Sequence, residues 1–379
     1  APQWTADGNA VCYAVADESG MQVWMVRRDG AAPVQLTRSP GGISRFILGQ
    51  AGRVIYFTRH VEASPGDWPE LRKQFDQSVE YGHGAHQQTE LLQHNLSSGE
   101  DTLLRHHNRY ITSFAVSPDE RRIALATAPD ERLITNEGES ILEIFEIGPG
   151  TLSTLPDDLW RKNANSPFAW IETPAWSPDG QRLAFRVGSD AFAPELIVAD
   201  LSGPKPELHQ LARPLECHPV QVSWHPDGRL LFTASHRAAI VLAAVDADQP
   251  DHYDFLAEGD VVVVAFSAAP DDGRIAIVQS TPESLPEIRL LFPDGNGRAL
   301  TKVHAHTADW DWPSLSRFNW RAPDGTALEG TLELPPGYQS GSRPLPLLVI
   351  LHGGPSAAAA MGRLFGIRGH TAFAARGYA

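Results

Sequence analysis

The stretch Trp176-Ser-Pro-Asp-Gly-Gln-Arg-Leu-Ala-Phe185 indicates the fold, because related stretches recur along the chain. Close copies are Val116-Ser-Pro-Asp-Glu-Arg-Arg-Ile-Ala-Leu125 and Trp224-His-Pro-Asp-Gly-Arg-Leu-Leu-Phe232. Three looser copies run from Trp4 to Tyr13, from Phe266 to Ile277 and from Phe46 to Phe57, the last of which has lost the Asp. A unit that recurs six times in this way predicts a repeat architecture.

Each copy places an apolar strand on either side of a Pro-Asp-Gly type turn, which is the pattern of a tight β-hairpin. The turns lie about 43 to 69 residues apart, and further strand-like runs lie between them: 142–147, 195–199 and 288–292. This spacing predicts a mostly β protein in which residues 1–310 form a β-propeller. Seven blades are expected, with six hairpin cores visible and part of the seventh upstream of Ala1. An Asp that caps its own turn is interpreted as scaffold.

Composition and charge narrow the function. The chain has 379 residues, 42% of them hydrophobic and 20% charged, with a net charge of −15 and a pI near 5.4. This acidic balance argues against nucleic acid as a partner, and no apolar run approaches the roughly 20 residues that span a bilayer. Cys12 and Cys217 fit neither a disulfide framework nor a zinc motif and are interpreted as buried, reduced thiols. A soluble, cytoplasmic protein is therefore expected.

Three pairs of histidines and one long insertion are the remaining features of the repeat region. The pairs are His83 with His86, His106 with His107, and His304 with His306. None has a third ligand in a recognised spacing, so we expect polar loop residues and no metal. Within residues 68–81, three apolar residues at i, i+4, i+8 spacing predict a short helix: Leu71, Phe75 and Val79. Surface packing is favoured for this insertion, with contact to a substrate or the second domain as the alternative.

The pattern changes after residue 310. A last hairpin is predicted from Leu315–Trp320 and Leu328–Leu334, and an apolar strand from Leu347 to Leu351 leads into His352-Gly-Gly-Pro355. A helix is predicted within Ala357 to Arg376, stopped by Gly377, and Tyr378-Ala379 would begin another strand. Hairpin, strand, glycine loop, helix and strand are the order in which an α/β-hydrolase sheet begins. Residues 311–379 are therefore predicted to be an incomplete hydrolase domain.

The two glycines of this loop suggest an oxyanion hole, because without Cβ atoms the backbone N–H groups can approach a ligand closely. The nucleophile of such a fold sits later, on a G-x-S-x-G elbow, and we find no such elbow in this chain. The nearest stretch, Gly82-His-Gly-Ala-His86, lacks both the Ser and a preceding strand. His352 is accordingly expected to orient the loop and not to act as a base. Ser356 is expected to cap the following helix.

Three motifs after the repeats identify a family that the chain resembles. They are Phe318-Asn-Trp-Arg-Ala-Pro-Asp-Gly-Thr326, the stretch from Gly330 to Pro336, and the strand ending in His352-Gly-Gly-Pro355. Together with the Ser-Pro-Asp-Gly turns they resemble the prolyl oligopeptidase family of serine peptidases, and the His-Gly-Gly-Pro form is similar to the acylaminoacyl-peptidase branch.

The resemblance implies hydrolysis of short peptides by a Ser-His-Asp triad that follows Ala379, with the propeller limiting access to the site. It implies that Gly354 donates its backbone N–H to the oxyanion, supported by His352, Gly353 and Pro355. No cofactor is implied, and assembly with further copies of the chain is left open. The alternatives are an esterase on the same scaffold and a non-enzymatic propeller that binds a partner. The 379-residue chain alone is expected to be inactive.

Overall fold

The computed structural model describes residues 2–61, 88–130, 138–163, 168–189, 192–212, 215, 218–351, 353, 360–363 and 370–379. The chain divides into two compact units. The first comprises Ala1–Ser189 with Ala199–Glu207, and the second comprises Asp190–Val198 with Leu208–Ala379. Each unit is described by itself.

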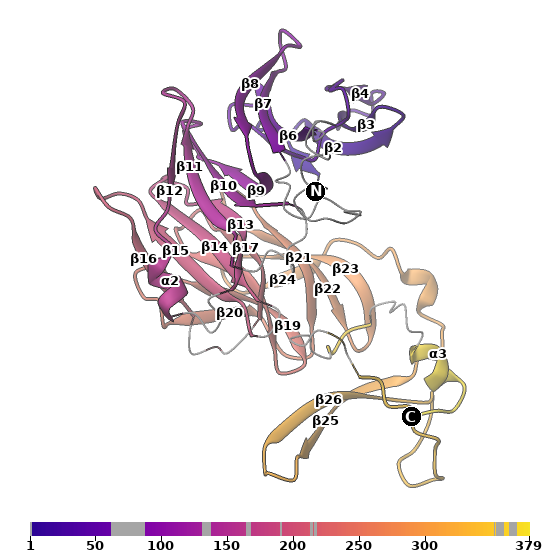
Figure 1. The fold of residues 1–379 in the computed structure, drawn as a ribbon. Helices are drawn as coiled ribbons and strands as arrows, with labels where there is room; N and C mark the ends of the chain where they lie inside the picture. The colour runs from indigo at the N-terminus through magenta and orange to yellow at the C-terminus, as the bar shows by residue number, and fades with distance from the viewer. Residues whose placement is uncertain are drawn as a thin grey trace, which may run out of the picture. The chain divides into compact units, whose positions relative to one another are not determined.

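The first four sheets each contain four strands in chain order (Figure 1). Their strands are β1 (Gln3–Trp4), β2 (Ala10–Asp17), β3 (Gly20–Arg27) and β4 (Val34–Gln35); β5 (Arg45–Leu48), β6 (Val54–Val61), β7 (Gln88–Asn95) and β8 (Asp101–His107); β9 (Tyr110–Val116), β10 (Arg122–Ala128), β11 (Ile141–Glu146) and β12 (Thr151–Thr154); β13 (Trp170–Trp176), β14 (Arg182–Gly188), β15 (Glu195–Asp200) and β16 (Glu207–Leu211). A short helix, α2 (Asp158–Asn163), follows β12.

The second unit contains an eight-stranded sheet made of two further antiparallel sets of four. The sets are β17 (His218–Trp224), β18 (Leu230–His236), β19 (Ala239–Val245) and β20 (Tyr253–Ala257), then β21 (Val262–Ala268), β22 (Ile275–Thr281), β23 (Ser284–Leu291) and β24 (Gly297–Ala299). One parallel pair, Ile240 with Val262, joins the two sets. All six predicted hairpins are confirmed as the first two strands of a four-stranded set. The protein is mostly β, with repeated four-stranded sheets of the propeller type.

Turn geometry explains why the Ser-Pro-Asp motif recurs. Asp179 accepts hydrogen bonds from the Ser177 hydroxyl at 2.5 Å and the Gln181 N–H at 3.0 Å, and Arg182 N–H donates to the Ser177 hydroxyl at 2.8 Å. The turn that contains Asp119 makes the same bonds. The hydrogen bond from Ser177 is the largest of the effects that lower the pKa of Asp179. The scaffold role predicted for these Asp residues agrees with these contacts.

The turn between β5 and β6, which lacks the Asp, is held by a residue of the turn between β9 and β10. Glu120 of the third turn accepts a hydrogen bond from the Ala51 N–H at 2.9 Å and another from the Tyr56 hydroxyl at 3.0 Å. Glu120 has a positive φ of 54°, a conformation that costs energy in a non-glycine residue. A carboxylate from the next sheet thus satisfies a turn that has no carboxylate of its own.

The sheets bury their faces against one another. Three clusters each draw residues from two successive sets of strands: Cys12, Val23, Ile43, Phe46, Ile55, Phe57 and Leu92; Tyr56, Leu91, Ile111, Phe114, Ile123, Leu125 and Phe145; and Leu231, Leu242, Ala244, Val263, Phe266, Ile275 and Ile277. Phe57 and Phe232 are fully buried, and each such side chain contributes roughly 1.5–3 kcal/mol by its burial. Cys12 is a free, buried thiol as predicted, and burial raises its pKa to about 11.

The histidine predictions need correction. His106 and His107 end strand β8 and are not loop residues. His107 is only 3% exposed, and its Nε2–H donates to Glu143 at 3.0 Å. His306 lies in the 3-10 helix η3 (Ala305–Thr307), which begins directly after His304. The sequence did not reveal that His106 and His107 end a strand, because polar residues can also end strands when a buried partner accepts their hydrogen bonds.

After the repeats, the predicted hairpin is present as the paired strands β25 (Ser314–Arg321) and β26 (Ala327–Leu334). A helix is described only as α3 (His370–Ala375), and residues 360–363 are not helical, so the helix predicted from Ala357 was too long. Several predictions fall outside the described residues: the helix within 68–81, His83, His86 and Cys217. In the described part of the chain, no helix is long and apolar enough to cross a bilayer.

Candidate functional site

The predicted glycine loop is described only at Gly353. No atom of a described residue lies within 4 Å of the place that a Cβ would take there. His352, Gly354, Pro355 and Ser356 lie outside the described residues. The role predicted for the Gly354 N–H therefore stays a prediction.

The apolar segment before the loop differs from the regular strand that the sequence predicts. Residues 344–351 belong to no assigned strand, and Leu347, Val349 and Leu351 are 69%, 67% and 81% exposed. Yet the Leu348 N–H donates to the Ala379 carbonyl at 2.8 Å, and the Ala379 N–H donates to the Pro346 carbonyl at 2.9 Å. Two parallel strands exchange hydrogen bonds in this pattern. Parallel strands are normally covered on both faces, whereas the apolar side chains of this segment are exposed.

The end of α3 follows the prediction for Gly377. Gly377 has a φ of 95°, its N–H donates to the Ala374 carbonyl at 3.0 Å, and the Tyr378 N–H donates to the Phe373 carbonyl at 3.2 Å. These two bonds form a Schellman motif, and the rings of Phe373 and Tyr378 add its usual apolar contact at 5.9 Å between centres. The cap turns the chain back towards Pro346.

A short segment after the glycine loop, Met361 to Arg363, is anchored on two β-hairpins of the second unit. The Met361 N–H donates to the Ala238 carbonyl at 2.7 Å, between β18 and β19. The Arg363 N–H donates to the Thr281 carbonyl at 3.2 Å, and the Arg363 carbonyl accepts from the Ser280 hydroxyl at 3.0 Å. Backbone groups that bond to these hairpins are not available for helical i to i−4 bonds, which explains why the helix does not begin here.

The Arg363 side chain strengthens this anchor. It is 8% exposed, it donates to the Pro313 carbonyl, and its guanidinium lies 4.7 Å from the centre of the Trp312 ring. Burial lowers the pKa of Arg363, although Glu333 and Glu283 act in the opposite direction. Nε and Nη1 make no hydrogen bond to any described residue. A desolvated cation over an aromatic face is worth roughly 2 kcal/mol, so this contact holds the segment next to the start of β25.

Gly362 is required by close packing, which gives a testable result. A Cβ there would lie 2.6 Å from Val262 Cγ2 and 2.9 Å from Val262 Cβ. Because the Val262 side chain is stiff and fully buried, Gly362→Ala is expected to weaken the anchor by about 1–3 kcal/mol. Hydrogen exchange at the Met361 amide should then become about tenfold faster or more. Gly148→Ala is the control, because a Cβ there would have no described atom within 4 Å, and equal exchange rates in both variants would contradict the packing argument.

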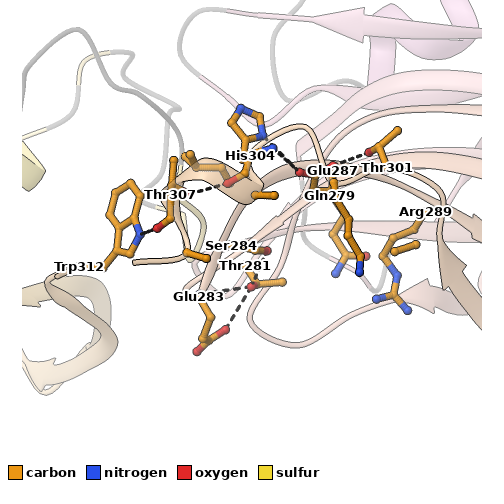
Figure 2. Close-up of a pocket in the computed structure, with 15 residues that line it drawn as sticks. Gln279, Thr281, Glu283, Ser284, Glu287, Arg289, Thr301, His304, Thr307 and Trp312 are labelled. Atoms are coloured by element: carbon orange, nitrogen blue, oxygen red, sulfur yellow. Dashed lines mark hydrogen bonds and ion pairs between the residues drawn. The ribbon is translucent and has the colours of Figure 1, made fainter. Parts of the chain in front are cut away.

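An open cleft of about 490 Å³ lies beside this anchor, between β22–β23 and residues 299–312 (Figure 2). Glu287 accepts hydrogen bonds from the Val303 N–H at 3.1 Å and the His304 N–H at 2.9 Å, and also from the Thr301 hydroxyl. Trp312 Nε1–H donates to the Thr307 carbonyl at 3.1 Å. The best-placed polar groups of the cleft are thus already occupied in holding this segment on the sheet. We interpret the cleft as a junction and not as the reactive site.

The sequence indicated the loop but not its anchor. Met361, Gly362 and Arg363 lie in an Ala-rich stretch that resembles a helix, and nothing local marks Arg363 as buried. A Gly between Met and Arg inside a predicted helix was the one signal that could have raised doubt. Among the described residues, no three metal-ligating side chains gather in one place.

Comparisons with known proteins agree with this architecture. A family model described as WD domain, G-beta repeat matches residues 209–241. Dipeptidyl-peptidase 5 of Porphyromonas endodontalis is 24% identical over 225 residues, which cover 52% of this chain and 30% of that protein. The acylaminoacyl peptidase of Pyrococcus horikoshii has a TM-score of 0.72 at 15% identity, covering 100% of this chain and 56% of that one.

A structure from a study of two prolyl endopeptidases has a TM-score of 0.58 at 16% identity, covering 92% of this chain and 46% of that one. The chain thus spans less than two thirds of each of these proteins. Identities this low show the fold alone. The predicted resemblance to the prolyl oligopeptidase family is confirmed at that level, and it extends to an acylaminoacyl peptidase.

Proposed function

We propose that this chain is the propeller and the start of the catalytic domain of a serine-type oligopeptidase. In this proposal residues 1–310 form the propeller, which limits access of short peptides, and residues 311–379 begin the hydrolase sheet. The Ser-His-Asp triad is supplied by residues beyond Ala379. Gly354 donates its N–H to the oxyanion, and the residue after the nucleophile supplies the second donor.

The anchor at Met361 to Arg363 carries the proposal. It ties the segment that follows the glycine loop to the hairpins β18–β19 and β22–β23, through backbone bonds of 2.7 and 3.2 Å. A loop that must stabilise an oxyanion has to be held in a fixed position, and anchors of this kind provide that. The strand-like bonds between residues 346–348 and Ala379 further support the beginning of a parallel sheet.

The test compares this chain with the longer protein that contains it. The longer protein is expected to hydrolyse N-acylated peptide amides and to react with a fluorophosphonate probe at a Ser after Ala379. The 379-residue chain is expected to remain unlabelled, because it has no G-x-S-x-G elbow. Cleavage of acyl esters without cleavage of peptide amides would favour the esterase instead. Covalent labelling of a Ser within residues 1–379 would contradict the proposal.

A further inference from the structure

Four residues at the start of the fourth sheet share one face of a strand pair. In the register of β13 and β14, Trp170 faces Gly188 and Glu172 faces Arg186. Positions two apart on a strand point to the same side, so these four form one group. A Cβ at Gly188 would lie 2.9 Å from both Trp170 Nε1 and Glu172 Oε2. The glycine therefore makes room for an indole N–H and a carboxylate that both lie over it.

Three polar atoms of this group are buried without a hydrogen-bond partner among the described residues: Trp170 Nε1, Glu172 Oε2 and Arg186 Nε. Trp170 is 9% exposed. Arg186 Nη1 lies 2.6 Å from Glu172 Oε2, close enough for an ion pair but without hydrogen-bond alignment. Buried polar groups in proteins are nearly always hydrogen-bonded, so three such atoms in one place require an explanation. The side chains of Glu172 and Arg186 are 25% and 22% exposed, so other atoms of these two residues lie at the protein surface.

The backbone beside Glu172 is strained, and a sheet of this kind can fold without a charged residue at the position of Glu172. Thr173, a β-branched residue, has a φ of 50°, and the register of β13 shifts between Glu172 and Ala175. The same register shift occurs in β9–β10, β17–β18 and β21–β22 and belongs to the repeated scaffold, whereas a positive φ in a β-branched residue is strain of the kind that concentrates at functional sites. Four residues before Trp224 and Phe266, which match Trp176 in the repeat, stand Val220 and Val262, where β13 has Glu172. A sheet of this type thus folds with valine at that position.

We propose that Trp170, Glu172, Arg186 and Gly188 form a binding site for an uncharged peptide group. The atoms without a hydrogen bond to any described residue are two N–H donors and one carboxylate oxygen, which is ion-paired with Arg186. A peptide group offers the complement, since its carbonyl oxygen has two lone pairs and its nitrogen carries one N–H. The ion pair of Glu172 with Arg186 is neutral overall, so a neutral amide fits better than a charged terminus. The ligand is taken from the proposed function, whose substrate is a peptide.

The test uses the 379-residue chain and its tryptophan indole N–H resonances, with Trp170 assigned from the peak that Trp170→Phe removes. N-acetylglycine N-methylamide is expected to shift this peak saturably. Gly188→Ala should abolish the shift, and Glu172→Gln should weaken binding about tenfold or more. Gly148→Ala should bind as the parent does. The other indole peaks report whether each variant is folded.

Several outcomes would overturn the inference. The first is the absence of a saturable shift up to the solubility limit of the probe, which would indicate that these groups bind structural water only. The second is a shift that stays unchanged in both Gly188→Ala and Glu172→Gln. The third is tighter binding of glycinamide or acetate than of the neutral amide. The readout does not depend on turnover. If the longer protein cleaves peptides while the Trp170 peak does not move, this inference alone fails. If the peak moves but peptides are not cleaved, the proposed function fails and the site stands.

Discussion

Glu143→Ala is expected to destabilise the protein by about 3–5 kcal/mol, because it removes the acceptor at the centre of a buried polar network. Glu143 is 5% exposed and accepts hydrogen bonds from His107 Nε2–H and the Thr127 hydroxyl, both at 3.0 Å. Arg109 donates to Thr127 at 3.1 Å, and its charge is balanced in part by Glu143. Urea unfolding followed by tryptophan fluorescence would measure the loss.

The same network gives the protein a pH dependence. Burial alone would raise the pKa of Glu143, but the hydrogen bonds from His107 and Thr127 and the charge of Arg109 outweigh it and lower the pKa. Because the folded-state pKa is below the unfolded one, the unfolded state binds the proton first as pH falls. The stabilisation is therefore present above the usual Glu range and is lost below about pH 4.5.

Glu143→Gln, which cannot titrate, is the matched control for this behaviour. Its deficit in unfolding free energy relative to the parent should shrink as the pH falls through the acid range. A deficit that stays constant between neutral and acid pH would show that Glu143 contributes by packing and not by its charge.

Gly354→Pro in the longer protein is expected to lower kcat on a peptide amide by about 10²–10³-fold, because proline has no N–H to donate to the oxyanion. KM should change much less, since the donor acts mainly in the transition state. Steady-state kinetics with one N-acylated peptide amide would separate the two effects.

The control for Gly354→Pro is the unfolding transition of the same variant, which should match that of the parent protein. A loss carried entirely by KM would indicate that the loop binds the ground state instead. Full activity with the fold retained would remove Gly354 from the oxyanion hole.

Local patterns were sufficient to predict the repeated hairpins and the cap of the last helix. A Ser-Pro-Asp-Gly turn closes on its own neighbours, as the bonds around Asp179 show, so its structure depends on about six consecutive residues. Gly377 ends α3 for the same reason: its positive φ and its bonds to the preceding turn are properties of a short segment. Patterns of this range can be read directly from a sequence.

The candidate sites could be predicted only in part, because long-range contacts complete them. The His-Gly-Gly-Pro motif pointed to an oxyanion loop, but no pattern predicted that Arg363 would stack on Trp312 or that Gly362 would pack against Val262. Residue type alone also did not distinguish His107 in a buried network from an exposed loop histidine. Burial depends on which distant strand supplies the partner.

By itself the sequence determined the number and spacing of the hairpins, the acidic net charge and the position of the glycine loop, since each depends on composition or on neighbouring residues. Only the tertiary structure decided which residues distant in the sequence lie together. It set Trp170 and Glu172 over Gly188 and fixed Met361 to Arg363 on two hairpins. The physical reason is range: a turn satisfies its polar groups within a few residues, whereas a buried charge must find its partner on another strand.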